Sequence, residues 1–163
     1  MKISIIVPVF NAADSIGRCI ESVLGQQGAE VELIVVDGGS TDGTVDIIRR
    51  YRDHIAWWVS EPDTGQTSAI NKGLSRSTGE VVNWLCADDM LTDGALKYVA
   101  EYFKAHPDVD LLAGACEMVY EETPGKNFVF VPRMNYSELL PAFDGIMQPS
   151  CFWRRRIMTR TPL

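Results

Sequence analysis

Two kinds of apolar pattern alternate along most of the chain. Short continuous apolar runs, rich in Val and Ile, are typical of strands covered on both faces of a sheet. Between them lie segments whose apolar side chains recur every three or four positions, as on one face of a helix. The predicted strands are residues 2–10, 31–36, 55–60, 81–86 and 109–113, and the predicted helices are 16–24, a segment from 45 onward, 66–77 and 95–105.

This alternation predicts the fold class. Four strand-to-helix steps with short connections indicate an α/β fold, with a mostly parallel, Rossmann-like sheet, right-handed crossovers and helices on both faces. Ligands of such sheets bind beyond the carboxyl ends of the strands. Those ends carry Asn11, Asp37, Asp63 and Asp88. The sequence therefore predicts a polar site along one edge of the sheet.

The pattern changes after residue 115. Residues 116–120 and 128–131 read as a hairpin around Pro124-Gly125, followed by a short helix near 137–143 and a strand near 148–153. We therefore divide a single domain into two parts. Residues 1–115 form a ligand-binding half, and residues 116–163 form the start of a second half, which we expect to be truncated.

Composition and charge narrow the functional classes. The chain has 163 residues, of which 46% are hydrophobic and 23% charged, as in one globular domain. A net charge of −7 argues against a nucleic-acid-binding protein, which needs a basic face. No segment has the roughly 20 apolar residues of a membrane-spanning helix. The four cysteines lack Cys-x-x-Cys spacing, so we expect reduced core side chains of a cytosolic protein, with zinc binding as the much less favoured alternative.

Two familiar phosphate-binding motifs are absent. The first strand is not followed by Gly-x-Gly-x-x-Gly, and no Gly-Lys-Ser/Thr loop occurs. Asp37 instead precedes Gly38-Gly39-Ser40. Its carboxylate could accept a hydrogen bond from a heterocyclic N–H while the glycines let the ligand approach the backbone. Hydrogen bonds from the amides of the same turn are an equal alternative.

The next two polar positions have simple local explanations. Asp63 precedes the predicted helix at 66–77, and local sequence favours a helix cap over ligand binding. Lys72 lies inside that helix, where a solvated position is favoured over a contact with phosphate.

Two neighbouring carboxylates follow the fourth predicted strand. If the strand continues to Asp88, alternation places Cys86 and Asp88 on one face and Ala87 and Asp89 on the other. Asp88 would then hold a divalent cation directly, while Asp89 would bind through water or cap the next helix. Mg²⁺ or Mn²⁺ needs further oxygen ligands, which a diphosphate supplies. An exposed acidic turn is the alternative.

Several stretches together resemble one enzyme family. They are Ile5-Ile6-Val7-Pro8-Val9-Phe10-Asn11, residues 33–44, Glu61-Pro62-Asp63-Thr64-Gly65-Gln66, Ala69-Ile70-Asn71-Lys72-Gly73 and residues 84–89. In order and spacing, over about the first 115 positions, they resemble the family-two glycosyltransferases. These are inverting enzymes of the GT-A fold that use nucleotide-sugar donors.

The resemblance implies roles at the nucleotide end of the site. Pro8, Val9, Phe10 and Asn11 would line the nucleotide pocket. Asp37 would hydrogen-bond the base, which is commonly uracil in this family.

The resemblance also implies roles around the diphosphate. Asp63 and Lys72 would border the ribose and diphosphate, and Asp88, with Asp89 beside it, would bind Mg²⁺ or Mn²⁺. Cys86 stands where the family's metal-binding motif begins with an acid, which puts the metal affinity in question.

The implied activity is transfer of a sugar from a nucleoside diphosphate, UDP above all, to a hydroxyl acceptor with inversion. The implied context is bacterial surface polysaccharide assembly, with a glycan or lipid-linked acceptor. The implied location is the cytoplasm, at the inner face of the membrane and in peripheral association with it. Inversion requires a general base. The sequence assigns neither Glu117 nor Asp144 to that role, so we expect the base to lie outside this chain. A non-catalytic nucleotide-sugar-binding module is the alternative function.

The chain also carries a basic cluster, Arg154-Arg155-Arg156. It could face a diphosphate or an anionic lipid, but a solvated basic end is the favoured interpretation.

Overall fold

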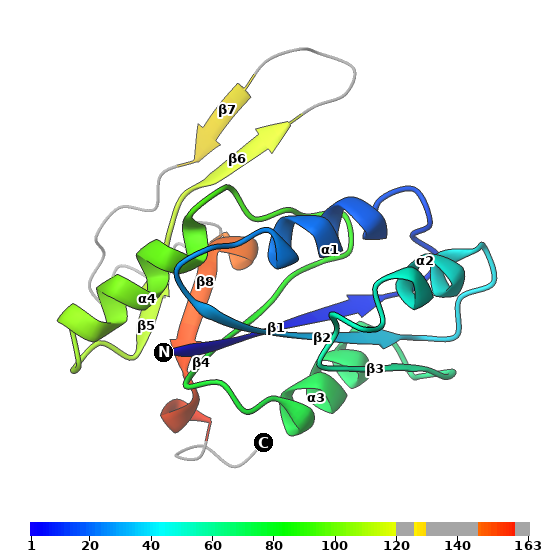
Figure 1. The fold of residues 1–163 in the computed structure, drawn as a ribbon, viewed down its shortest axis with the longest axis horizontal. Coiled ribbons are helices and arrows are strands. Elements are labelled where there is room, and N and C mark those ends of the chain that lie inside the picture. The colour runs from blue at the N-terminus through cyan, green and yellow to red at the C-terminus, as the bar shows by residue number, and fades with distance from the viewer. Residues whose placement is uncertain (120–125, 130–146, 159–163) are drawn as a thin grey trace, which may run out of the picture.

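The computed structural model describes residues 1–119, 126–129 and 147–158, and its centre is a six-stranded sheet (Figure 1). The strands lie in the order β3-β2-β1-β4-β8-β5. Their bounds are β1 Lys2–Val9, β2 Glu30–Asp37, β3 Trp57–Ser60, β4 Val81–Trp84, β5 Leu111–Ala113 and β8 Cys151–Arg154. β1 to β4 pair in parallel, whereas β8 is antiparallel to both β4 and β5. The predicted mostly parallel α/β sheet is confirmed.

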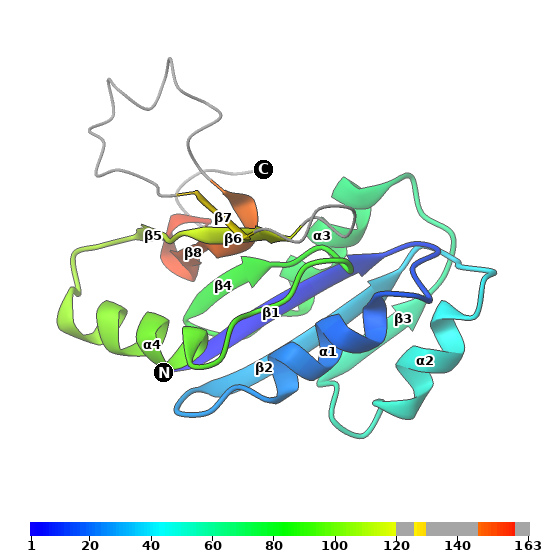
Figure 2. The same ribbon diagram turned by 90° about the horizontal axis from the view of Figure 1, so that it is seen from above.

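Helices cover both faces of this sheet, as predicted (Figure 2). They are α1 Ile16–Leu24, α2 Thr44–Arg50, α3 Gln66–Arg76 and α4 Ala95–Ala105. The larger apolar core joins one face of β1 to α1, α2 and α4, and the smaller core joins the other face to α3. Alternation along β1 explains the division, because Ile5 and Val7 belong to the larger core and Ile6 to the smaller one. No helix among the described residues has the length and apolar character needed to cross a membrane.

Several strands are shorter than predicted. β3 begins at Trp57, β4 ends at Trp84 and β5 begins at Leu111. The end of β4 matters most for the site. The amide of Asp89 donates to the carbonyl of Cys86 at 3.0 Å, which closes a turn. The strand therefore ends before Asp88, so the condition under which alternation would place Asp88 and Asp89 on opposite faces is not met.

The second part of the chain contains the predicted hairpin. β6 (Cys116–Val119) pairs antiparallel with β7 (Lys126–Val129). The strand predicted at 148–153 begins only at Cys151, because Gln148–Ser150 form a 3-10 helix. The helix predicted near 137–143 lies outside the described residues. No disulfide forms among the described residues, and of the four free thiols only that of Cys19 is fully buried.

A buried carboxylate joins β1 and β2 at the end of the sheet where these strands begin. Glu32 accepts hydrogen bonds from the Ser4 hydroxyl (2.6 Å), from the amide and hydroxyl of Thr78 (both 2.6 Å) and from the Lys2 ammonium (2.7 Å). Burial alone raises the pKa of this carboxyl, but the hydrogen bonds from Lys2, Ser4 and Thr78 outweigh burial and lower the pKa to about 2.

The lowered pKa of Glu32 predicts how stability depends on pH. Since the folded state holds the carboxylate ionised, its contribution is fully present above the unfolded pKa of 4.5 and is lost as the pH falls through about 2. We expect Glu32→Gln to lower the free energy of unfolding by up to about 3 kcal/mol at pH 7. The difference from the wild type should shrink steadily between these two pKa values. Urea denaturation of both proteins at a series of pH values measures it.

The control is Glu30→Gln, which removes an exposed carboxylate from the same strand. Its difference from the wild type should stay below about 0.5 kcal/mol at every pH. A Glu32→Gln difference that does not change with pH would contradict the assigned hydrogen bonding.

Candidate functional site

The carboxyl ends of the parallel strands open into a cavity of about 830 Å³. The loop after β1, the turn after β2, the start of α3 and the turn after β4 all contribute to its wall. The lining residues are Pro8 to Ser15, Gly38, Asp42, Asp63, Gly65, Gln66, Ala69 and Cys86 to Asp88. The structure thus brings together the polar ends of β1, β3 and β4, which lie far apart in the sequence.

The loop after β1 is braced against the turn after β2. Asn11 adopts a left-handed backbone conformation, with φ of 47°, which asparagine tolerates better than most residues. Its amide donates to the Ser40 hydroxyl at 2.7 Å, and its side-chain oxygen accepts from the Thr41 amide at 2.9 Å. Beside it, the Phe10 ring lines the cavity and is 64% exposed. An aromatic face is therefore available to a ligand at a rigid position.

Asp37 lies under the cavity and is absent from its lining. Its carboxylate is fully buried and accepts hydrogen bonds from the Gly39 amide (3.1 Å), the Ser40 amide (3.0 Å), the Ser40 hydroxyl and the Ser60 hydroxyl (2.6 Å). The Asp37 carboxylate therefore receives hydrogen bonds from its own turn, which is the alternative that the sequence left open beside ligand binding. A hydrogen bond from Asp37 to a base stays a prediction.

Asp63 lines the cavity, whereas Lys72 does not. Asp63 accepts from the Gly65 amide at 2.7 Å, so it shapes the turn before α3, but the N-cap residue of α3 is Gly65 and not Asp63. A side chain at Gly38 would meet the Asp63 carboxylate at 3.1 Å, which explains the glycine there. Lys72 pairs with Glu61 at 2.5 Å. A contact between Lys72 and a phosphate therefore stays a prediction. The alternative was a solvated ammonium group, but the structure places this group in an ion pair.

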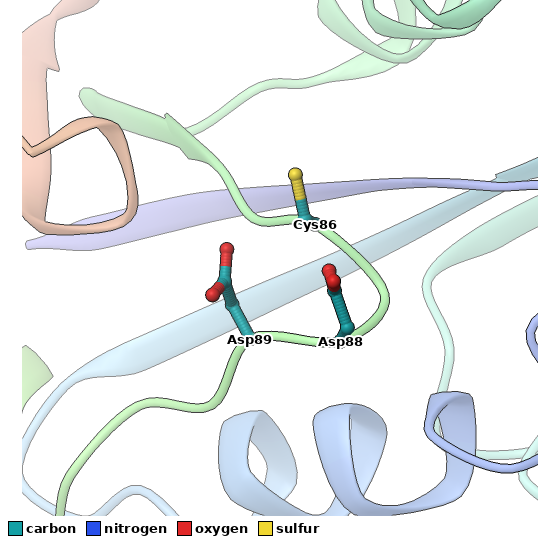
Figure 3. Close-up of side chains that lie close together, drawn as sticks. All are labelled: Cys86, Asp88 and Asp89. Carbon is teal, nitrogen blue, oxygen red and sulfur yellow. The ribbon is translucent and has the colours of Figure 1, made fainter. Parts of the chain in front are cut away.

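The turn after β4 gathers Cys86, Asp88 and Asp89. One ligand atom from each lies within 4.8 Å of the others. In Figure 3 the two carboxylates and the thiol extend in the same general direction from the backbone of the turn. Alternation along a strand would have separated Asp88 from Asp89, but the turn brings them together. Asp89 does not cap α4, whose N-cap residue is Gly94.

The electrostatics of this turn favour a cation. Burial and the neighbouring Asp88 raise the pKa of the Asp89 carboxyl, and burial together with both carboxylates raises the pKa of the Cys86 thiol. A divalent cation would relieve this repulsion, and two carboxylates supply oxygens of the kind that Mg²⁺ and Mn²⁺ bind. The donor set therefore fits a divalent cation, with a sulfur as its third member.

Two further residues of the cavity wall make contacts that the sequence did not predict. Asp42 accepts from the Ala13 amide (3.0 Å) and from the Thr44 amide and hydroxyl (3.0 and 2.6 Å), which ties the start of α2 to the loop after β1. Gln66, the first residue of α3, donates from its side-chain amide to the Cys86 sulfur at 3.5 Å. Both lie inside stretches that carry the family resemblance, which was the available signal.

The basic cluster does not reach the cavity. Arg154 donates to the carbonyls of Val109 and Phe103 (2.9 and 2.6 Å), and Arg155 donates to the Gly79 carbonyl (2.8 Å). Arg156 pairs with Asp110 at 2.5 Å. Arg154 and Arg155 thus bind neighbouring backbone carbonyls, so the prediction of a solvated basic end is wrong for these two residues, whereas Arg156 is exposed and forms an ion pair. Asp144 lies outside the described residues.

Known proteins share both the sequence and the fold of this chain. The putative teichuronic acid biosynthesis glycosyltransferase TuaG of Bacillus subtilis strain 168 is 33% identical over 144 residues, covering 85% of this chain and 56% of that protein. The crystal structure of S. aureus TarS 1-349 in complex with UDP superposes with a TM-score of 0.77 and 25% identity, covering 98% of this chain and 48% of that chain.

A third protein shares the fold alone. The mannosyltransferase PcManGT from Pyrobaculum calidifontis, solved with GDP-Man and Mn²⁺, superposes with a TM-score of 0.71 and 23% identity, covering 97% of this chain and 46% of that chain. The chain therefore spans about half the length of these relatives. The expected GT-A fold is confirmed. Residues 4–160 match the family model described as Glycosyl transferase family 2, and the chain belongs to this family.

Proposed function

We propose that this chain contains the donor-binding half of an enzyme that transfers a sugar from a UDP-linked donor to a hydroxyl acceptor with inversion. The observation that carries the proposal is the cavity at the carboxyl ends of the strands, because one wall offers an aromatic ring and the other a cluster of carboxylates. Its volume of about 830 Å³ lies within the range of small-molecule sites. The similarity to TarS, which was solved with UDP, supports the choice of nucleotide.

The base and ribose bind, in this proposal, between the loop after β1 and the turn after β2. Phe10 supplies an exposed aromatic face, and Gly38 lets a ligand approach the backbone. Pro8, Val9 and Asn11 complete this wall. Asp63 offers its second carboxylate oxygen to a ribose hydroxyl. Asp37 acts from below, by holding the turn after β2 in place.

The diphosphate binds, in this proposal, between α3 and the turn after β4. Gly65 begins α3 without a side-chain cap, so the first amides of the helix are available to an anion beside the cavity. Asp88 and Asp89 would hold Mg²⁺ or Mn²⁺ against the phosphate oxygens. When bound, such a cation stabilises the negative charge that develops on the departing nucleoside diphosphate.

The acceptor side is proposed from chemistry and similarity. Inversion in one step requires a base that takes the proton of the acceptor hydroxyl. We assign no residue of this chain to that role, and we place the base in the acceptor-side half, of which residues 116–163 would form the start. The name of the B. subtilis relative supports a role in surface polysaccharide synthesis. We propose that this takes place in the cytoplasm, at the inner face of the membrane, with a glycan or lipid-linked acceptor.

Calorimetry with UDP, in the presence of Mn²⁺ or of EDTA, tests the donor site. We expect Mn²⁺ to increase the affinity for UDP, since a cation held by Asp88 and Asp89 would attract the negatively charged diphosphate. Asp88→Asn should reduce the affinity in Mn²⁺ at least about tenfold, which is about 1.4 kcal/mol, and change it little in EDTA.

The matched control is Asp93→Asn, an exposed acid that follows the same turn outside the cavity, and it should leave both affinities unchanged. Equal affinities in Mn²⁺ and EDTA for the wild type would remove the cation from the proposal. Donor binding without hydrolysis or transfer, over a panel of nucleotide-sugars, would favour a non-catalytic nucleotide-sugar-binding module.

A further inference from the structure

A thiol occupies one corner of the cation site. The Cys86 sulfur and one oxygen from each of Asp88 and Asp89 lie within 4.8 Å of one another, and both Cys86 and Asp88 line the cavity. Ligand atoms of one tetrahedral zinc ion lie about 3.5 Å apart, given bond lengths of about 2.0–2.3 Å. The spacing of this set is thus close to that of the ligand atoms around one cation.

The backbone of residue 86 is fixed from several sides. The Leu85 amide donates to the Ile6 carbonyl at 2.8 Å, and the Leu85 side chain is fully buried. The Cys86 carbonyl accepts from the Asp89 amide at 3.0 Å and from the Cys19 thiol at 3.5 Å. The backbone that carries the thiol is therefore held at a defined position in the turn.

The sulfur itself is directed at the cavity. Gln66, an exposed residue of the cavity wall, donates to it at 3.5 Å. Cys19 differs in this respect, because its side chain is fully buried in the larger apolar core and donates to a backbone carbonyl. Packing accounts for Cys19, whereas Cys86 presents a ligand atom next to two carboxylates.

We propose that the Cys86 thiol binds the cation directly and shifts the preference of the site from Mg²⁺ toward thiophilic divalent cations such as Zn²⁺, Co²⁺ and Cd²⁺. Thiolate is a soft ligand that favours zinc and related ions, whereas Mg²⁺ requires an octahedron of oxygens. The inference rests on the proposed function in one respect: the diphosphate of the donor completes the coordination that three side chains begin.

The test is a Co²⁺ titration of the purified chain followed by absorbance, with and without UDP. The wild type should develop the near-ultraviolet charge-transfer band of a sulfur-to-cobalt bond. Cys86→Ser should lose this band, and Cys116→Ser, which removes a half-buried thiol outside the cavity, should keep it. In competition experiments, Cys86→Asp should lower the preference for Cd²⁺ over Mn²⁺ at least about tenfold.

Three outcomes separate the possibilities. A wild-type cobalt complex without the band overturns the thiol ligand, and so does a preference for Cd²⁺ over Mn²⁺ that Cys86→Asp leaves unchanged. If UDP binding by the same protein still depends on Mn²⁺, the proposed function stands. The band without any binding of UDP supports the thiol ligand and rejects the proposed function. If Cys86→Ser does not fold, Cys86→Asn takes its place, and the wild-type spectrum alone still decides whether sulfur binds the metal.

Discussion

Gly73→Ala is expected to lower the free energy of unfolding by about 2 kcal/mol, and Gly73→Val to prevent folding. Gly73 is the point at which α3 packs on β1, and a Cβ atom there would overlap Ile6 Cγ2 and lie 3.1 Å from Ile6 Cγ1. Ile6 is fully buried at the centre of the sheet, so it has no free space to move into. The gain in helix propensity from glycine to alanine, about 1 kcal/mol, offsets only part of this overlap.

Gly17→Ala provides a matched control within another helix. A Cβ atom at Gly17 would lie 3.7 Å from Ile47 Cγ2, an ordinary van der Waals contact. This variant should therefore be more stable than the wild type by about 0.5–1 kcal/mol. Urea denaturation of both variants gives the comparison. Stabilisation by Gly73→Ala as well would show that α3 lies farther from β1 than in this structure.

The position of α3 also matters for the site. The first residues of α3, Gly65 at its N-cap and Gln66, form one wall of the cavity, and Gly73 sets the distance of that helix from the sheet. Gly73→Ala should therefore weaken UDP binding by displacing α3, although residue 73 does not line the cavity.

The sequence was informative wherever a local pattern decides the structure. Continuous apolar runs and helical spacing predicted β1 and β2 and the helices α1, α3 and α4 to within one or two residues. The rule that parallel strands end at a common edge placed Asn11, Asp63 and Asp88 at one cavity. These predictions depend on side-chain periodicity and on connection handedness, both of which are local properties.

The sequence did not predict features that depend on pairing between strands far apart in the chain. β8 inserts between β4 and β5 and is antiparallel to both, and nothing in residues 151–154 specifies those partners. The grouping of Asp88 with Asp89 depends on the point at which β4 ends, and the apolar run gives no signal for a turn after Trp84. The family resemblance identified Asp37 as important without showing that its carboxylate is buried under the turn.

Asp37→Ala is expected to have the second large effect, a loss of about 3–4 kcal/mol in the free energy of unfolding. The variant removes a fully buried acceptor of four hydrogen bonds, two from backbone amides and two from hydroxyls, and these bonds hold the turn after β2 together. Asp37→Asn should cost less, about 1–2 kcal/mol, because its amide oxygen can replace the carboxylate oxygen that accepts three of the four hydrogen bonds. Urea denaturation measures both losses.

The same variants decide how Asp37 acts on the ligand. Since the Ser40 hydroxyl bonds both Asp37 and the Asn11 amide, loss of the carboxylate should loosen the turn after β2 and the loop after β1 together. UDP affinity should therefore fall with stability across Asp37→Asn and Asp37→Ala. Asp46→Asn, an exposed acid in one ion pair with Arg49, should change neither by more than about 0.5 kcal/mol. If Asp37→Asn kept full stability but abolished UDP binding, the carboxylate would have to contact the base directly, and its hydrogen bonds to the turn would have to open when the nucleotide binds.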